Sequence, residues 1–249
     1  SQYADDHIVM GDNLRAVITG GGSGIGEATS KLMLEAGYEV ISVGLHEPSW
    51  THERLTSFSC DLLDIVATKT LAAELAENHA ITHFIHNAGM IRQKSLEDVM
   101  VEDLHDLTQL HAGGALVFTQ ALAPGMKERK FGRIIFNSSR ALLGLQSRSA
   151  YSYSKAGIVG MARTWALELA PHGITVNVLA PGPILTDNFW ELVEKDSPEQ
   201  HAYAAKVPVR RLGEPEDVAN AILFFADPKS GFVTGQTLFV CGGLSVFSG

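Results

Sequence analysis

The chain of 249 residues is 45% hydrophobic and 19% charged, a balance typical of a folded globular protein that excludes a disordered one. Its net charge of −9 disfavours nucleic-acid binding, because that requires clustered lysines and arginines. No run reaches the roughly 18 apolar residues of a membrane-spanning helix, so we expect no membrane association. The two cysteines, Cys60 and Cys241, are too few for a disulfide framework and indicate a reducing compartment, the cytoplasm.

Short apolar runs alternate with longer segments of helical periodicity. The runs predict seven strands, at residues 14–19, 39–44, 55–60, 82–87, 132–137, 174–180 and 236–240. Helical spacing predicts helices that include residues 25–36, 65–78, 103–129 and 152–171. Strands that alternate with helices form a parallel sheet covered on both faces. We therefore predict a polar N-terminal extension at 1–13 and one α/β domain at 14–249, built on a doubly wound seven-stranded parallel sheet with helices on both faces.

Two segments depart from the simple alternation. Residues 45–54 join the second and third predicted strands, and because they include Pro48 we expect a loop there and no helix. Residues 187–212 have no strand pattern and predict a helical flap. Apolar side chains at helical spacing in this flap, such as Trp190, either close over a bound ligand or pack against the domain.

The first predicted strand ends in the glycine-rich sequence TGGGSGIG, residues 19–26, directly before a predicted helix. Glycine permits a sharp turn and lets the backbone approach a phosphate closely. The start of the following helix presents free N–H groups and the positive end of the helix dipole. The spacing G-x-x-x-G-x-G therefore predicts a site for the pyrophosphate of a dinucleotide; the alternative is a tight turn without a ligand.

A tyrosine and a lysine, Tyr151 and Lys155, are spaced to share one face of a predicted helix. A nearby cation lowers the phenol pKa from its usual value of about 10, which produces a usable general acid and base. Ser138 and Ser139 follow the predicted strand at 132–137, at the edge where open α/β sheets bind ligands. The alternative for the tyrosine and lysine is a surface pair.

From about Leu14 to Ser245 the chain resembles the classical short-chain dehydrogenase/reductase family. The matching motifs are the turn at 19–26, Asp61, Asn87-Ala88-Gly89, Ser139 with Tyr151-x-x-x-Lys155, Asn177, the segments 181–186 and 211–219, Thr234-Gly235-Gln236 and Gly242-Gly243. The resemblance implies a single Rossmann-type domain and an NAD(P)-dependent oxidoreductase that interconverts a secondary alcohol and a ketone by hydride transfer. It also implies a small-molecule substrate, a homotetramer and a substrate lid at 187–212.

The resemblance assigns a role to each motif. Tyr151 is expected to be the general acid and base, Ser139 to hold the substrate oxygen, and Lys155 to lower the Tyr151 pKa and to bind the nicotinamide ribose. The other expected cofactor contacts are Gly20, Ser23, Gly24, Ile25 and Gly26 in the turn, Leu45 after the second strand, Asp61 and Leu62 at the adenine, Asn87, Ala88 and Gly89 beside the cofactor, Ile184 and Thr186 at the carboxamide, and Pro181 and Gly182 just before them.

The catalytic serine can be assigned in two ways. Counting from the predicted strand selects Ser139, whereas counting back from Tyr151 by the usual family interval selects Ser138. We prefer Ser139.

Two histidines replace family residues. The place of the active-site Asn, whose backbone carbonyl orders a water in a proton relay to the lysine, holds His111. Its imidazole either joins that relay or packs as an ordinary helix residue. His86 replaces the first Asn of the usual triplet, and we expect a structural role for it.

The choice between NAD and NADP is weakly encoded. Where the second strand ends, NAD-dependent members of the family carry an Asp that binds the ribose diol, and this chain has Gly44 and Leu45. NADP-dependent members place a basic residue nearby to pair the 2′-phosphate. Glu47 suits the ribose hydroxyls, whereas His46 or Arg54 would suit a phosphate. The lack of a clear cation favours NAD.

Substrate recognition is predicted from three residues. Arg140 and Arg148 flank the expected site and are candidates to pair a carboxylate, sulfonate or phosphate of the substrate; the alternative is an ion pair at a surface or a subunit interface. Trp190 in the flap is a third candidate. The ten histidines lack acidic or cysteine companions at chelating spacing, so we predict no metal site.

Two further functions are alternatives to this predicted activity. An acyl-carrier-protein reductase acting on 3-oxoacyl thioesters would use a basic stretch, Lys127, Arg129, Lys130 and Arg133, to dock an acidic carrier; a basic helix end also arises without any partner. A non-catalytic dinucleotide-binding scaffold or sensor would explain the substitution at His111. The intact Ser139, Tyr151 and Lys155 argue against a scaffold.

Overall fold

The computed structural model describes residues 13–246. Apart from Asn13, the extension predicted at 1–13 lies outside the described residues, as do the last three residues of the predicted domain. The strands are β1 (Arg15–Thr19), β2 (Glu39–Gly44), β3 (Leu55–Ser59), β4 (His83–His86), β5 (Gly132–Asn137), β6 (Ile174–Pro181) and β7 (Thr237–Val240). The helices are α1 (Gly24–Glu35), α2 (Ile65–Asn78), α3 (Val101–Leu107), α4 (Gly114–Arg129), α5 (Ser149–Leu169), α6 (Asp187–Trp190), α7 (Pro198–Lys206) and α8 (Pro215–Ala226).

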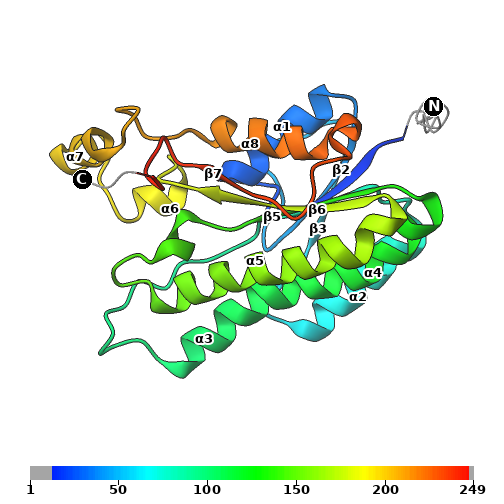
Figure 1. Cartoon of the computed structure of the whole chain (residues 1–249), viewed down its shortest axis with the longest axis horizontal. Coiled ribbons are helices and arrows are strands. Elements are labelled where there is room, and N and C mark those ends of the chain that lie inside the picture. The colour runs from blue at the N-terminus through cyan, green and yellow to red at the C-terminus, as the bar shows by residue number, and fades with distance from the viewer. Residues whose placement is uncertain (1–12, 247–249) are drawn as a thin grey trace.

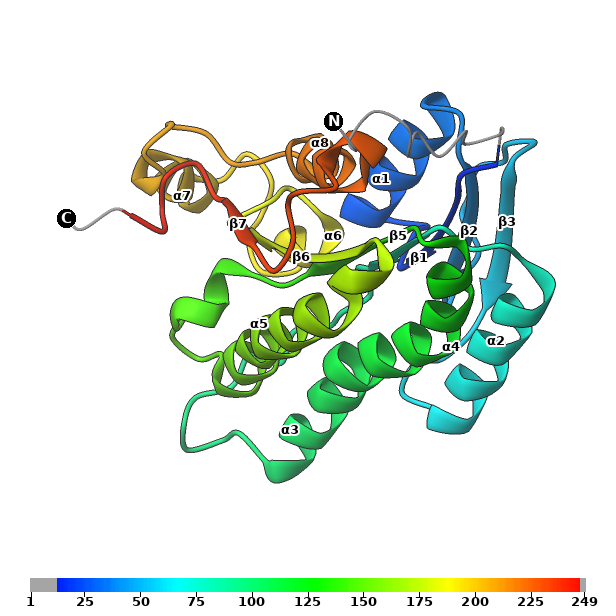
Figure 2. The same ribbon diagram turned by 45° about the vertical axis from the view of Figure 1, so that its right-hand side comes forward.

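The strands form one parallel, seven-stranded sheet in the order β3-β2-β1-β4-β5-β6-β7. Helices α1 and α8 cover one face, and α2, α4 and α5 cover the other (Figures 1 and 2). This confirms the predicted doubly wound sheet. From β1 the chain builds outward to β2 and β3, and it then returns to place β4 on the other side of β1. Open α/β sheets bind ligands at the carboxyl ends of the strands where the direction of winding changes in this way.

Each face of the sheet has its own hydrophobic core, because side chains of a strand alternate between the two faces. Phe84, Phe118 and Phe136 lie in the core under α2, α4 and α5. Ile18 and Ile222 lie in the core under α1 and α8. Burial on both faces explains why the central strands read as nearly continuous apolar runs. Within residues 13–246, no helix has the length and apolarity required to cross a membrane.

The long helix predicted at 103–129 is interrupted. A π-helical turn (Thr108–Gly113) separates α3 from α4. The imidazole of His86, from β4, explains the interruption: its Nε2 bonds the carbonyl oxygen of Leu110 at 3.0 Å, and a side chain at Gly114 would lie 2.8 Å from the ring. His86 therefore has the structural role expected of it.

The two irregular segments agree with the prediction in outline. Residues 45–54 connect β2 and β3 without a helix, as expected. The flap at 187–212 contains two short helices, α6 and α7. Both lie beyond the carboxyl ends of β6 and β7 (Figure 1), on the side of the sheet edge where a ligand is expected.

Candidate active site

A cavity of about 1070 Å³ opens at the carboxyl ends of the central strands. Its lining extends from the glycine turn to the flap, so the cavity has room for two ligands at once. Most of the site residues predicted from the sequence line it: Gly20, Ser23, Gly24, Ile25, Leu45, Asp61, Leu62, Asn87, Ala88, Gly89, Ser139, Arg140, Arg148, Tyr151, Lys155, Pro181, Gly182, Ile184 and Thr186. Gly26, His111 and Trp190 were also predicted but do not line it among the described residues.

The glycine turn leaves space that side chains would fill. Gly20 and Gly24 have φ of +67° and +53°, which favour glycine over other residues. A Cβ on Gly26 would lie 1.8 Å from the carbonyl oxygen of Gly20. Only glycine at position 26 therefore allows α1 to approach the turn this closely. Ser23, the residue before α1, makes no side-chain cap. The first N–H groups of α1 are thus free for an anion, as a pyrophosphate requires.

A closed hydrogen-bond network fixes the strand ends beside this turn. The hydroxyl of Thr19 accepts bonds from the backbone N–H groups of Asn87 and Ala88, both at 3.0 Å. Its own proton goes to Nδ1 of His86 at 2.8 Å, since Nε2 of that ring donates to Leu110. Burial lowers the pKa of His86 to about 4. A neutral histidine with both nitrogens engaged therefore joins β1, β4 and the π-helical turn.

Lys155 provides the test of whether these residues fit a nucleotide ribose. Its ammonium is buried and donates to the carbonyl oxygen of Asn137 at 2.8 Å. An ammonium has three donors, and this is its one hydrogen bond among the described residues. Burial lowers the pKa of Lys155 to about 7. Ribose hydroxyls at the cavity wall would supply the missing acceptors, so the residues present fit the cofactor.

Tyr151 lines the cavity next to Lys155. The ammonium of Lys155 is 5.7 Å from the centre of its ring. Burial raises the pKa of Tyr151, and neighbouring Ser139 and Arg148 oppose that rise. The sequence had led us to expect a lowered pKa caused by Lys155; desolvation dominates instead. A partly buried phenol whose pKa is raised holds its proton at neutral pH and can donate it.

The two serines before η2 (Arg140–Leu143) differ in orientation. Ser138 is buried and its hydroxyl donates to the carbonyl oxygen of Lys155 at 2.7 Å, so it fixes α5 to β5. Ser139 lines the cavity beside the Tyr151 phenol, and its hydroxyl accepts from the backbone N–H of Ala141 at 3.1 Å. Of the two hydroxyls, the one on Ser139 is available to a substrate oxygen.

His111 sits in the π-helical turn and is fully buried. Its Nε2 accepts from the backbone N–H of Met90 at 3.2 Å, which leaves the proton on Nδ1, 2.8 Å from the hydroxyl of Ser154. Burial holds the pKa of His111 well below its usual value. Both nitrogens are engaged, and the geometry favours the packed helix residue over an imidazole in the proton relay.

Two residues lie away from the places predicted for them. Trp190 packs edge-on against Phe189 at 5.2 Å, and Phe189 lines the cavity in its place. Arg54 precedes β3, at the opposite end of the strands, where its guanidinium bonds the carbonyl oxygens of Leu34 and Tyr38. It therefore cannot read a 2′-phosphate beside Gly44.

The basic stretch at 127–133 is also at the wrong end of the sheet. It spans the end of α4 and the start of β5, whereas the cavity lies at the carboxyl end of β5. Arg129 donates to the carbonyl oxygen of Ile81. Arg133 is buried and donates to the carbonyl oxygens of Gly132 and Pro228, both at 2.9 Å. These arginines hold the fold together and do not form a docking surface at the cavity mouth.

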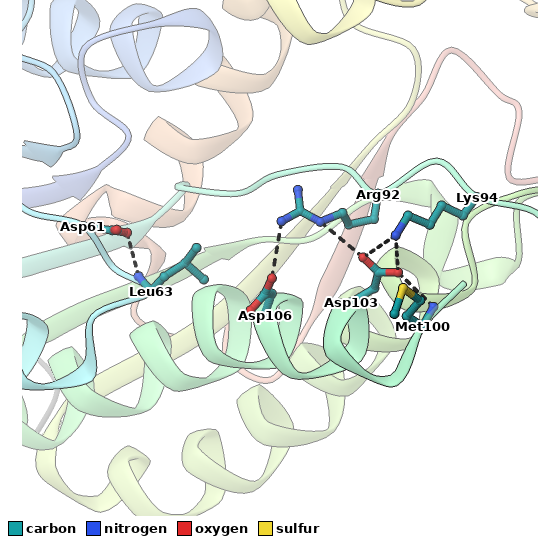
Figure 3. A network of polar contacts seen from close by, with 7 residues as sticks. All are labelled: Asp61, Leu63, Arg92, Lys94, Met100, Asp103 and Asp106. Atoms are coloured by element: carbon teal, nitrogen blue, oxygen red, sulfur yellow. Dashed lines mark hydrogen bonds and ion pairs between the residues drawn. The ribbon is translucent and has the colours of Figure 1, made fainter. Parts of the chain in front are cut away.

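The segment between β4 and α3 was missed by sequence analysis. Met90, Ile91 and Gln93 line the cavity. An ionic network holds the segment on α3 (Figure 3): the carboxylate of Asp103 bonds the ammonium of Lys94 at 2.7 Å and the guanidinium of Arg92 at 3.5 Å. The only sequence signal is the local density of opposite charges, which does not specify which pairs meet.

Comparison with known proteins gives consistent matches over nearly the whole chain. A family model described as Enoyl-(Acyl carrier protein) reductase matches residues 20–245. The chain is 38% identical over 247 residues to (2S)-[(R)-hydroxy(phenyl)methyl]succinyl-CoA dehydrogenase subunit BbsD of Thauera aromatica, covering 95% of this chain and 98% of that protein. It is 31% identical over 237 residues to 3-oxoacyl-[acyl-carrier-protein] reductase FabG of Vibrio harveyi, covering 92% and 96%.

Solved structures show the same fold. A protein from Beutenbergia cavernae, crystallised with NADP bound at low occupancy, superimposes with a TM-score of 0.86 at 30% identity, over 92% of this chain and 96% of that chain. The ligand-free aldohexose dehydrogenase of Thermoplasma acidophilum gives a TM-score of 0.87 at 25% identity, over 95% of both chains. The match to the family model, over residues 20–245, includes both residues 20–26 and Tyr151.

Proposed function

Because the chain belongs to the classical short-chain dehydrogenase/reductase family, a family of NAD(P)-dependent oxidoreductases, we propose that it interconverts a hydroxyl and a ketone on an acyl thioester, with NAD(H) as cofactor. The observation that carries the proposal is the convergence of Ser139, Tyr151 and Lys155 on one cavity with the glycine turn. In this arrangement a bound dinucleotide and a substrate carbonyl share the same cavity.

The roles of the side chains follow from their positions. When bound, the nicotinamide supplies the hydride in reduction and accepts it in oxidation. In reduction the hydroxyl of Ser139 donates a hydrogen bond to the carbonyl oxygen of the substrate. Tyr151 transfers its phenolic proton to that oxygen as negative charge develops, and the ammonium of Lys155 stabilises the resulting phenolate. Oxidation is the reverse, with the phenolate taking the hydroxyl proton.

The names of the relatives support a thioester substrate. One is named for a substituted succinyl-CoA and the other for a 3-oxoacyl group on a carrier protein. The substrate end of this cavity has an apolar wall suited to an acyl chain, with Leu145, Phe189, Leu192 and Val193 among its residues. Since the basic stretch at 127–133 lies at the far end of the sheet, we favour a thioester of coenzyme A over one on a carrier protein.

We propose NAD(H) as the physiological cofactor because of the charges at the end of β2. Glu47 lines the cavity there, and no Arg or Lys from the described residues lines this end. A carboxylate accepts from the ribose hydroxyls but repels a 2′-phosphate. His46 is the remaining group able to approach that phosphate.

The purified protein should therefore bind NADH at least about 10-fold more tightly than NADPH, as one unfavourable charge contact of about 1.4 kcal/mol would produce. Titration of the intrinsic nucleotide fluorescence measures both affinities. Glu47→Gln should narrow the preference by strengthening NADPH binding. Tighter binding of NADPH to the unaltered protein would overturn the assignment.

We also propose a homotetramer located in the cytoplasm. Two separate surfaces expose apolar side chains: Leu116, Tyr153 and Leu167 on α4 and α5, and Phe224 and Phe232 on and after α8. Helices α4 and α5 lie side by side on one face (Figure 2). Two distinct apolar surfaces support two different pairings of identical subunits. The two thiols, both free, support a reducing compartment.

A further inference from the structure

Arg148 is a buried cation that has no acidic partner among the described residues. Its exposed fraction is 9%. The guanidinium donates to the carbonyl oxygen of Ser147 at 3.2 Å and to the side-chain oxygen of Gln93 at 3.1 Å. A guanidinium has five donors, so most of its bonding capacity is unused. Burial without an anion is costly for such a charge, and burial accordingly lowers the pKa of Arg148.

Arg148 is also part of the wall of the active-site cavity. Arg148 lines the cavity and precedes Tyr151 by one helical turn at the start of α5. It is close enough to the phenol to lower the Tyr151 pKa. An anion bound to Arg148 would consequently lie within a few bonds of the carbon that gains or loses hydride.

The position of Arg148 is built by neighbouring elements at some energetic cost. Ser147 has a φ of 58°, a backbone conformation that residues other than glycine rarely adopt. The backbone N–H of Lys94 holds it there, bonding the carbonyl oxygen of Ser147 at 3.1 Å. Lys94 is itself fixed on α3 by Asp103 in the network of Figure 3. Strain that surrounding contacts maintain is characteristic of functional positions.

A second buried arginine, Arg133, has a structural role and serves as a comparison for Arg148. Arg133 has an exposed fraction of 3%, and its donors reach the carbonyl oxygens of Gly132, Asp227 and Pro228. Those bonds join separate segments of the chain. Arg148 is less fully bonded and faces the cavity, so structural bonding does not account for it.

The charges around the substrate end of the cavity also favour an anion. Arg148, Arg140 and Lys206 line it. Among residues 13–246, three acidic residues line the cavity. Glu47 and Asp61 follow β2 and β3 and lie at the nucleotide end, so Asp187, at the start of the flap, is the one of these three at the substrate end. The local balance is therefore positive even though the chain as a whole carries a net charge of −9.

We propose that Arg148 forms a subsite for a carboxylate of the substrate, so that the natural substrate is a hydroxyacyl or oxoacyl thioester that carries a free carboxylate. A planar guanidinium matches a carboxylate through two parallel hydrogen bonds. The carboxylate orients the substrate so that its carbonyl oxygen meets Ser139 and Tyr151. This inference rests on the proposed hydroxyl–ketone activity and adds the class of substrate to it.

The test compares two substrates that differ only in the carboxylate, 3-oxoadipyl-coenzyme A and 3-oxohexanoyl-coenzyme A. Oxidation of NADH is followed by its absorbance, and the readout is the ratio of kcat/KM for the two substrates. We expect the unaltered enzyme to prefer the carboxylate and Arg148→Met to lower the ratio about 10- to 100-fold, as loss of a charge-assisted hydrogen bond would produce. Any effect of Arg148 on the Tyr151 pKa acts on both substrates and cancels in the ratio.

Matched variants separate the outcomes. Arg148→Lys keeps the charge without the planar fork and should lower the ratio by less than Arg148→Met. Lys229→Met removes an exposed cation outside the cavity and should leave the ratio unchanged. An unaltered enzyme that reduces both substrates equally, or a ratio that Arg148→Met does not change, overturns the carboxylate subsite. Failure to reduce either substrate would instead count against the proposed function.

Discussion

Replacing Tyr151 by Phe is expected to lower kcat by about 10²- to 10⁴-fold, the usual contribution of a positioned acid or base. The substitution removes one oxygen from a partly buried side chain that lies against Lys155 and Ser139. Because the ring remains, the cavity keeps its shape, and NADH should still bind saturably. The measurement pairs NADH oxidation in the presence of a 3-oxoacyl thioester with a fluorescence titration of the same variant.

Tyr153 provides the matched control for this experiment. It lies two residues further along α5, and its side chain is 56% exposed. Tyr153→Phe should retain the turnover of the unaltered enzyme. If Tyr151→Phe also retained it, Tyr151 would not be the acid and base. If instead the unaltered protein bound NADH saturably but turned over no substrate, the non-catalytic dinucleotide-binding scaffold would become the better account.

The second large effect is expected from Gly26→Ala. The added methyl group would lie 1.8 Å from the carbonyl oxygen of Gly20 and 2.7 Å from the side-chain nitrogen of Asn87. One of these contacts is with backbone, so the turn itself must move. We expect a loss of about 1–3 kcal/mol in the free energy of unfolding, as for other overpacked sites, and loss of saturable NADH binding.

Gly160→Ala is the control, because the added methyl group has no neighbour within 4 Å. Gly160 lies inside α5, where alanine stabilises a helix by roughly 0.5–1 kcal/mol relative to glycine. The free energy of unfolding, measured by denaturant titration, should therefore fall for Gly26→Ala and rise for Gly160→Ala. Unchanged NADH affinity in Gly26→Ala would contradict the assignment of the turn as the pyrophosphate site.

The sequence predicts those features that depend on local pattern. Buried parallel strands are read from apolar runs, and each predicted strand agrees with the observed one to within about two residues. The glycine turn could be placed because its residues are adjacent in the chain. Tyr151 and Lys155 could be paired because helical geometry brings residues four apart together.

Features that depend on contacts between distant segments could not be predicted. The π-helical turn exists because His86, on another strand, bonds Leu110, and a helical pattern contains no sign of that contact. Arg54 is close in sequence to the end of β2 but follows a loop that returns to the opposite end of the sheet. The raised Tyr151 pKa depends on burial, which the Tyr-x-x-x-Lys spacing does not encode.

Direct transfer of hydride from the cofactor to the substrate carbon is the central claim of this account. The most direct measurement is the reduction of a 3-oxoacyl-coenzyme A by NADH that carries deuterium at both hydrogens of the nicotinamide C4. Mass spectrometry of the product should find one deuterium, bound to the carbon of the new hydroxyl group. A product without deuterium, or no product although NADH binds saturably, would contradict the account.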